Sequence, residues 1–321
     1  MNPNEIPKWL DSASIDIIAA KILYGEGRRR KKSENLQLLA LYHLQQANEK
    51  VNKVAIKLFG LLFSSMIRMM PDAKVKYRKV YKLINEIAST EEKTIGHDAH
   101  KWFDQRARAF LILFKTGEGN RLMKDFTNSI FVATMVKFIE SFNMPEEVKT
   151  LLKEIISFFT SSINEFLEKY RLNLKIAPPP ERRIIEETSD FERIEAGISI
   201  YKESTGAINH AFNIADYSEF KIAKGSFNKK MLSFFTNMAN MIDFLRGLVG
   251  TTTLSFMFEN FEFKTRYPDQ GLIDDRIFER IPELIRHNEE CQIWIRNSSK
   301  FMCETLESIS SKQNDVTIND D

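Results

Sequence analysis

The clearest hydrophobic pattern in the chain lies between Leu36 and Leu62. Apolar residues recur there every three or four positions, the spacing that places side chains on one face of an α-helix. These residues are Ala40, Leu44, Ala47, Val51, Val54, Leu58 and Leu62. We therefore predict a long helix over 36–62 with one face in a protein core.

A second stripe on the same predicted helix is polar and mostly basic. It consists of His43, Gln46, Lys50, Lys53 and Lys57. Glu49 precedes Lys53 by four residues, which is the favourable order for an ion pair on a helix. The stripe is either the solvated flank of a core helix or a basic binding surface.

Further helices are predicted on both sides of this one. The first runs from about Asp11 to Tyr24, with Asp11 or Ser12 as N-cap and the segment Gly25–Gly27 as its end. A Met- and Phe-rich helix covers 228–248, and the following LSFMFENFEF segment fits either a short strand or a helix. The last long helix covers 275–308, where Pro282 marks either a kink or the first turn.

Composition supports a fold made of helices. The chain has 321 residues, 43% of them hydrophobic, with 25 Phe against 12 Gly and 9 Pro. This balance favours long uninterrupted helices, and strand-like alternation is scarce. We predict an all-α protein, with its sharpest break at Ala177–Pro180, where three prolines cannot continue a helix.

Charge and cysteine content limit the function classes. The formal net charge is +2, from 46 basic and 44 acidic residues, so any basic site must be local. Cys291 and Cys303 have no Cys or His neighbours at metal-ligand spacing, and we interpret both as reduced thiols, with no metal site. The N-terminus has no signal-peptide pattern and no apolar run is long enough to cross a bilayer, which predicts a soluble cytoplasmic protein.

Three short motifs resemble one protein family. The run LYHLQQANEKVNK (residues 41–53) resembles the second helix of HEPN (higher eukaryotes and prokaryotes nucleotide-binding) domains. Trp9 followed by Asp16 is similar to the family's first helix, and Arg266-Tyr267-Pro268 resembles the RYP turn before its last helix.

The resemblance implies a HEPN-like up-down helical bundle. Its first part spans residues 1–110 and its last helix lies in 263–310. Residues 111–262 form a helical insertion that contains the Pro-rich break at 177–180, and residues 311–321 form a disordered tail.

Many HEPN proteins are metal-independent ribonucleases that use an Arg followed by a His on the final helix. The nearest fit here is Arg280 and His287, seven residues apart and therefore on one helix face, together with Arg276, Glu283 and Trp294. The arginine would stabilise the developing phosphate charge and the histidine would transfer a proton. This chemistry needs no metal and no cofactor.

Two other functions are compatible with the resemblance. We expect nucleotide or RNA binding in a toxin-antitoxin or defence system, by a homodimer whose groove is lined by Lys50, Lys53, Lys57 and Arg266. RNA cleavage by Arg280 and His287 is the alternative. The third hypothesis is a non-catalytic scaffold whose insertion contacts a partner, such as a nucleotidyltransferase.

Overall fold

The fold is entirely helical in the part of the chain that the computed structural model describes. These residues are 5–30, 33–68, 73–82, 117–125, 136, 140, 146–147, 149–150, 153–154, 157, 189–211, 229–258 and 273–316. Its helices are α1 (Ile6–Arg29), α2 (Glu34–Arg68), α3 (Ala73–Lys76), α7 (Gly117–Asp125), α11 (Asp190–Ala211), α13 (Lys229–Phe258), the 3₁₀ helix η5 (Asp275–Arg280) and α15 (Ile281–Val316). The predicted all-α class is confirmed, whereas the break at 177–180 lies outside the described residues.

The central helix α2 follows the predicted apolar seam. Its six seam residues from Ala40 to Leu58 are all buried, in one core with residues of α1, α11, α13 and α15. The predicted pair of Glu49 and Lys53 is also present, with Nζ and Oε1 2.9 Å apart. Both side chains of this pair are buried, so the polar stripe is not a solvated flank at this point.

Helix α1 is longer than predicted at both ends. It begins at Ile6, with Pro7 in its first turn where a missing N–H costs nothing, and it runs through Gly25 and Gly27 to Arg29. The prediction that these glycines end the helix is wrong. Gly27 is buried at a close approach of α2, where a Cβ would lie 3.3 Å from both Gln37 Cγ and Leu36 Cβ.

Helix α13 continues through Gly250 and the Thr251–Thr253 run, so residues 254–258 of the ambiguous segment are helical. The buried hydroxyls bond to carbonyls one turn back: Thr251 Oγ1 donates to Gly247 O (2.7 Å) and Thr252 Oγ1 to Leu248 O (2.7 Å). These bonds satisfy polar groups that burial would otherwise penalise.

Helix α15 follows directly on η5, and Pro282 lies in its first turn rather than at a kink within it. Asp274 caps η5 by accepting a bond from Arg276 N (3.0 Å). The helix extends past the predicted end at Ser308 to Val316. Residues 311–316 of the predicted disordered tail therefore belong to α15.

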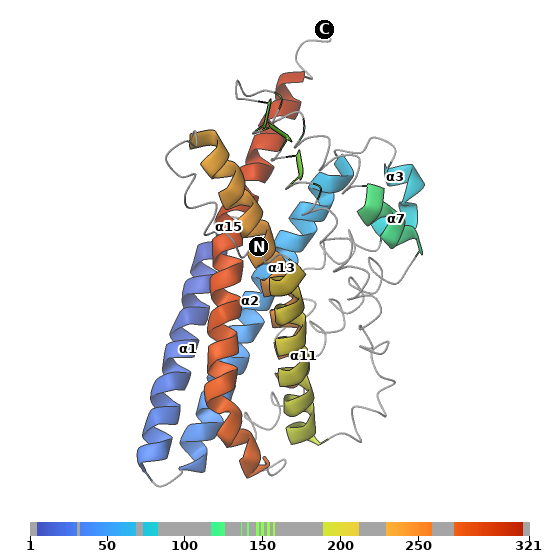
Figure 1. Cartoon of the computed structure of the whole chain (residues 1–321). Helices are drawn as coiled ribbons and strands as arrows, with labels where there is room; N and C mark the ends of the chain where they lie inside the picture. The colour runs from blue at the N-terminus through green and yellow to red at the C-terminus, as the bar shows by residue number, and fades with distance from the viewer. Residues whose placement is uncertain are drawn as a thin grey trace.

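The five long helices of the described part of the chain share one core. Helix α1 packs on α2 and α15, α13 packs on α15 and α2, and α11 packs on α13 (Figure 1). Helices α11 and α13 fall within the predicted insertion 111–262, yet they contribute to the same buried core as α1, α2 and α15. This packing brings the start of α15 beside α11, where the candidate site lies.

Candidate functional site

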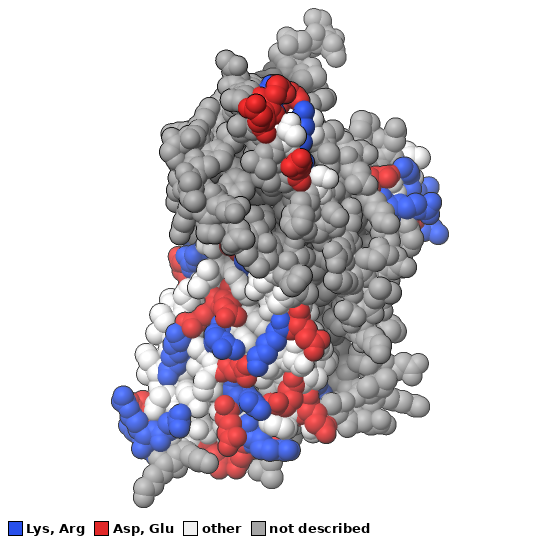
Figure 2. Space-filling view, in the orientation of Figure 1, with Lys and Arg blue, Asp and Glu red and all other residues white. Residues whose placement is uncertain are grey.

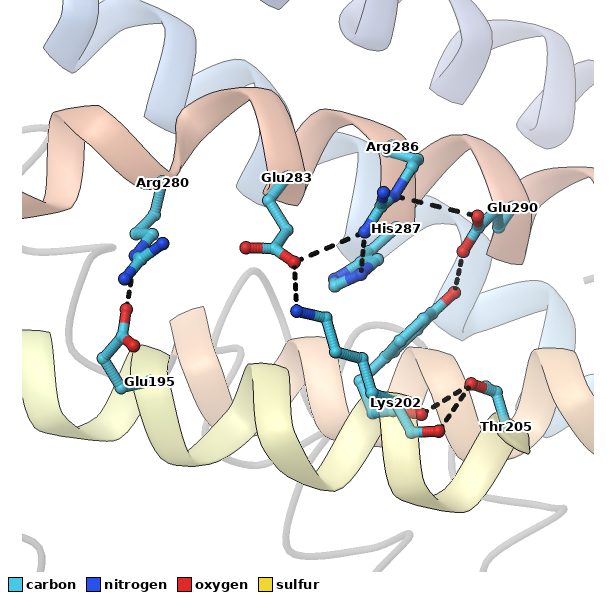
Figure 3. Close-up of polar contacts among 9 residues, drawn as sticks. Glu195, Lys202, Thr205, Arg280, Glu283, Arg286, His287 and Glu290 are labelled. Atoms are coloured by element: carbon cyan, nitrogen blue, oxygen red, sulfur yellow. Dashed lines mark hydrogen bonds and ion pairs between the residues drawn. The ribbon is translucent and has the colours of Figure 1, made fainter. Parts of the chain in front are cut away.

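Polar side chains of α11 meet those of η5 and α15 at two successive levels (Figure 3). Glu195 forms an ion pair with Arg280 at the end of η5. Lys202 Nζ lies 2.8 Å from Glu283 Oε1. Residue numbers increase in the same direction along both segments, so the two helices run parallel at this face.

A stacked aromatic pair lies between these helices. The rings of Tyr201 and His287 are stacked, with centroids 3.9 Å apart and planes 20° apart, and Trp294 lies 6.4 Å from Tyr201 at 18°. Gly250 of α13 makes room for the pair, since a Cβ there would be 3.0 Å from Tyr201 Cε2 and 2.5 Å from Cys291 Sγ. A glycine is therefore required where α11, α13 and α15 meet.

His287 is almost completely enclosed, with 1% of its surface exposed. Burial and then the nearby charge of Arg286 lower its pKa to about 4. The Nδ1 atom has no hydrogen-bond partner among the described residues, and Nε2 lies 3.4 Å from Arg286 Nη2. The imidazole is therefore neutral at pH 7, and it is a weak base.

The Tyr201 hydroxyl is held in its protonated form. Burial raises the pKa of this hydroxyl most, and electrostatic interactions with Cys291 and Glu290 raise the pKa further. The hydroxyl donates to Glu290 Oε2 (2.8 Å) and lies 3.7 Å from Cys291 Sγ. The phenol thus has a positioning role in this arrangement and does not provide an ionised nucleophile.

Three cations reach the solvent at this site: Lys202, Arg280 and Arg286. Arg286 lies between two carboxylates, 3.3 Å from Glu283 Oε1 and 3.9 Å from Glu290 Oε1. Burial would raise the pKa of Glu283, but the hydrogen bond and charge of Lys202, with the charges of His287 and Arg286, lower it overall. All three cations are therefore matched by carboxylates in this structure.

The predicted catalytic pair lies on the side that faces α11, with Arg280 at the end of η5, His287 on α15 and Glu283 between them (Figure 3). The structure brings His287 next to Arg286, while Arg280 binds Glu195. Of the residues expected on the same face, Glu283 and Trp294 take part in the site. Arg276 instead binds Asp274 and lies over the Phe191 ring.

The predicted phosphate-binding lysines are placed differently from the expected groove. Lys50 forms an ion pair with Asp16 of α1, whose Oδ1 also lies 3.0 Å from His43 Nδ1. Lys53 is buried against Glu49, with its ammonium 4.8 Å from the centre of the Trp9 ring. Lys57 is partly exposed on α2. Arg266 lies outside the described residues.

Sequence reasoning missed Glu195, Tyr201 and Lys202 on α11. Each lies more than 80 residues from its partner on η5 or α15, and helical periodicity gives no information about contacts between distant segments. Arg286 was visible in the sequence as the neighbour of His287. Its role depends on the rotation of α15 towards α11.

The fold and this site define a helical-bundle protein with a charge-paired surface over a buried aromatic stack. The chain matches no family model, no curated protein and no solved structure in the comparisons with known proteins. In the described ranges, no group of three or more His, Cys, Asp or Glu side chains is placed to hold a metal ion. The helices described here include none with the length and apolar character to span a membrane.

Proposed function

We propose that the protein is a HEPN-like helical bundle that binds a nucleotide or RNA through phosphate, on the face between α11 and α15. The observation that carries the proposal is the grouping of Lys202, Arg280 and Arg286 at this face. Lysine and arginine donate strong charge-assisted hydrogen bonds to phosphate, and arginine also matches its bidentate geometry.

The carboxylates at this face do not prevent such binding. An exposed ion pair contributes about 0–1 kcal/mol, so a cation loses little when it exchanges a carboxylate for a phosphate. The existing pairs also hold the cations in place before a ligand arrives, which reduces the entropy lost on binding. The expected ligand therefore competes with Glu283 and Glu195 for their cations.

The aromatic stack makes binding independent of base identity. An exposed aromatic ring can stack on a nucleic-acid base. Tyr201 and His287 are instead buried and stack on each other, so their rings are not available to bases in this structure. Recognition then depends on phosphates, which carry no sequence information directly. The affinity should fall steeply as the salt concentration increases.

The test is a fluorescence-anisotropy titration of a labelled single-stranded RNA at several salt concentrations. Lys202→Gln should weaken binding about tenfold, since a hydrogen bond to a charged group contributes about 1.5–3 kcal/mol. It should also reduce the salt slope by about 0.7, the value for one phosphate contact on a single strand.

Lys76→Gln is the matched control. Both lysines are ion-paired, with 58% and 59% of their side chains exposed, but Lys76 lies on α3 beside Asp125. Its replacement should leave the affinity unchanged. Equal effects of the two substitutions, or no binding of the wild type at low salt, would refute the proposed face.

Metal-independent RNA cleavage is the second candidate function. The supporting observation is the guanidinium of Arg286 next to the His287 imidazole, with 3.4 Å between Nη2 and Nε2. A neutral imidazole accepts a proton from a 2′-hydroxyl, and the guanidinium stabilises the charge that develops on the phosphate. Cleavage then requires the Tyr201 stack to open, because His287 is enclosed.

The cleavage assay uses RNA without added metal. His287→Phe should abolish RNA cleavage, whereas the control His43→Ala should not. Comparison of Arg286→Lys with Arg280→Lys shows which arginine takes part in cleavage. With His287 as the general base, the rate should rise with pH until the imidazole is deprotonated and should then be constant. Uncleaved RNA with the wild type, despite binding, argues for the non-catalytic function.

The partner and the biological setting rest on the resemblance alone. A nucleotidyltransferase partner and a toxin-antitoxin or defence role stay predictions. Co-purification of the protein with a nucleotidyltransferase encoded beside it would test both.

A further inference from the structure

Three isoleucines form an exposed stripe on the outer face of α1. Ile15, Ile18 and Ile22 have 66%, 56% and 61% of their surface exposed, whereas the opposite face of this helix packs on α2 and α15. They are separated by three and four residues, and the next position in this spacing is Gly25. A Cβ at Gly25 would meet no atom within 4 Å.

A fourth isoleucine extends the stripe onto α15. Lys21 pairs with Glu289, and Arg296 Nη2 lies 2.8 Å from Asp11 Oδ1. These two pairs fix an antiparallel register that places Ile293, which is 51% exposed, on the α1 side between them. Helices α1 and α15 lie side by side at the edge of the bundle (Figure 1).

This patch has the anatomy of a protein interface. Its centre is apolar, and the ion pairs Lys21–Glu289 and Arg296–Asp11 flank it. Charged side chains surround uncharged ones over this part of the surface (Figure 2).

The spacing of the stripe indicates the shape of the occupant. Positions 15, 18, 22 and 25 alternate steps of three and four, which is the pattern of a seam between two helices. Gly25 costs about 1 kcal/mol relative to alanine in a helix, and no contact among the described residues accounts for it. A close approach by a helix from another molecule gives this glycine a function.

We propose that α1 pairs with α1 of a second copy of this chain in antiparallel orientation. In the pairing that the seam allows, Ile18 lies opposite Ile22 of the second copy, and Ile15 fits over Gly25 of that copy. The same pairing puts Asp11 opposite Arg29 of the second copy. Both side chains are largely exposed, so the pairing brings opposite charges together without breaking a buried contact.

The first test is sedimentation velocity over a range of protein concentrations. The wild type should form a dimer of twice 37.4 kDa at high concentration. Ile18→Glu should weaken dimerisation at least about tenfold, because it buries two charges near the twofold axis. Val75→Glu on α3, also an exposed apolar residue, is the control and should dimerise as the wild type does.

The second test exchanges charges and does not depend on the folding of an isoleucine variant. Asp11→Arg alone and Arg29→Asp alone should each weaken the dimer, since each places like charges opposite one another. The two substitutions together should restore it. A wild type that stays monomeric, a dimer insensitive to Ile18→Glu, or a double variant weaker than both single ones would overturn the proposed pairing.

Discussion

Gly250 is a position where one added methyl group should have a large structural effect. This residue lies in α13, at the point where Tyr201 of α11 and Cys291 of α15 both approach the backbone. In Gly250→Ala the new Cβ would be 2.5 Å from Cys291 Sγ and 3.0 Å from Tyr201 Cε2. Both neighbours are buried, so the helices must move apart.

The expected magnitude comes from two opposing terms. Overpacking a tight core costs about 1–3 kcal/mol, and a contact as short as 2.5 Å belongs at the upper end of this range. Replacing glycine by alanine within a helix returns about 1 kcal/mol. We therefore expect the free energy of unfolding to fall by about 2 kcal/mol.

The measurement is urea denaturation followed by circular dichroism. Gly206→Ala is the matched control, because Gly206 is exposed in the middle of α11 with nothing within 4 Å of its Cβ position. This control should stabilise the protein by about 0.5–1 kcal/mol. Adding Cys291→Ala to Gly250→Ala should recover part of the loss, since it removes the clashing sulfur. Similar unfolding midpoints for Gly250→Ala and Gly206→Ala would refute the close packing.

Two further predictions concern buried charges. Burial lowers the pKa of His287 from 6.5 to about 4 in the folded state. Between these two pH values the unfolded state therefore binds more protons than the folded state. The free energy of unfolding should fall by up to about 3 kcal/mol as the pH falls from 6.5 to 4. His287→Phe removes this titration, and the loss between pH 6.5 and 4, measured by urea denaturation, should become smaller. Lys53→Met leaves Glu49 buried without its ammonium partner and should cost about 3–5 kcal/mol, whereas Lys50→Met, at a more exposed pair, should cost about 1 kcal/mol. The measurement is the unfolding temperature of each variant, and equal decreases for Lys53→Met and Lys50→Met would contradict the difference in burial.

Periodicity was sufficient to predict the helices and the buried seam of α2, because that signal is repeated over many residues. Helix ends were predicted less well. Gly25 and Gly27 have the composition of a helix terminator, but Gly27 is needed for the close approach of α2 and the helix continues past it. A sequence alone does not show whether a glycine provides a turn or a contact between helices.

The candidate site was only partly accessible to sequence reasoning. Arg280 and His287, which the spacing placed on one helix face, lie in η5 and α15, and both are on the side that faces α11. Burial of His287 under Tyr201 and the pairing of Arg280 with Glu195 depend on α11. Contacts of this kind are determined by tertiary packing, which local patterns do not encode.

The basic stripe of α2 illustrates why a polar pattern is ambiguous on a central helix. Helix α2 packs on α1, α13 and α15, so its polar face is also covered by protein. Polar groups of α2 that are covered in this way form contacts with neighbouring helices: Lys50 pairs with Asp16, and Asn48 Nδ2 donates to Ser255 Oγ (3.2 Å). Such contacts form only when the neighbouring helices have the correct register, so the stripe determines how the bundle assembles. For this reason the proposed phosphate site is placed on an exposed face, between α11 and α15, where Lys202, Arg280 and Arg286 reach the solvent.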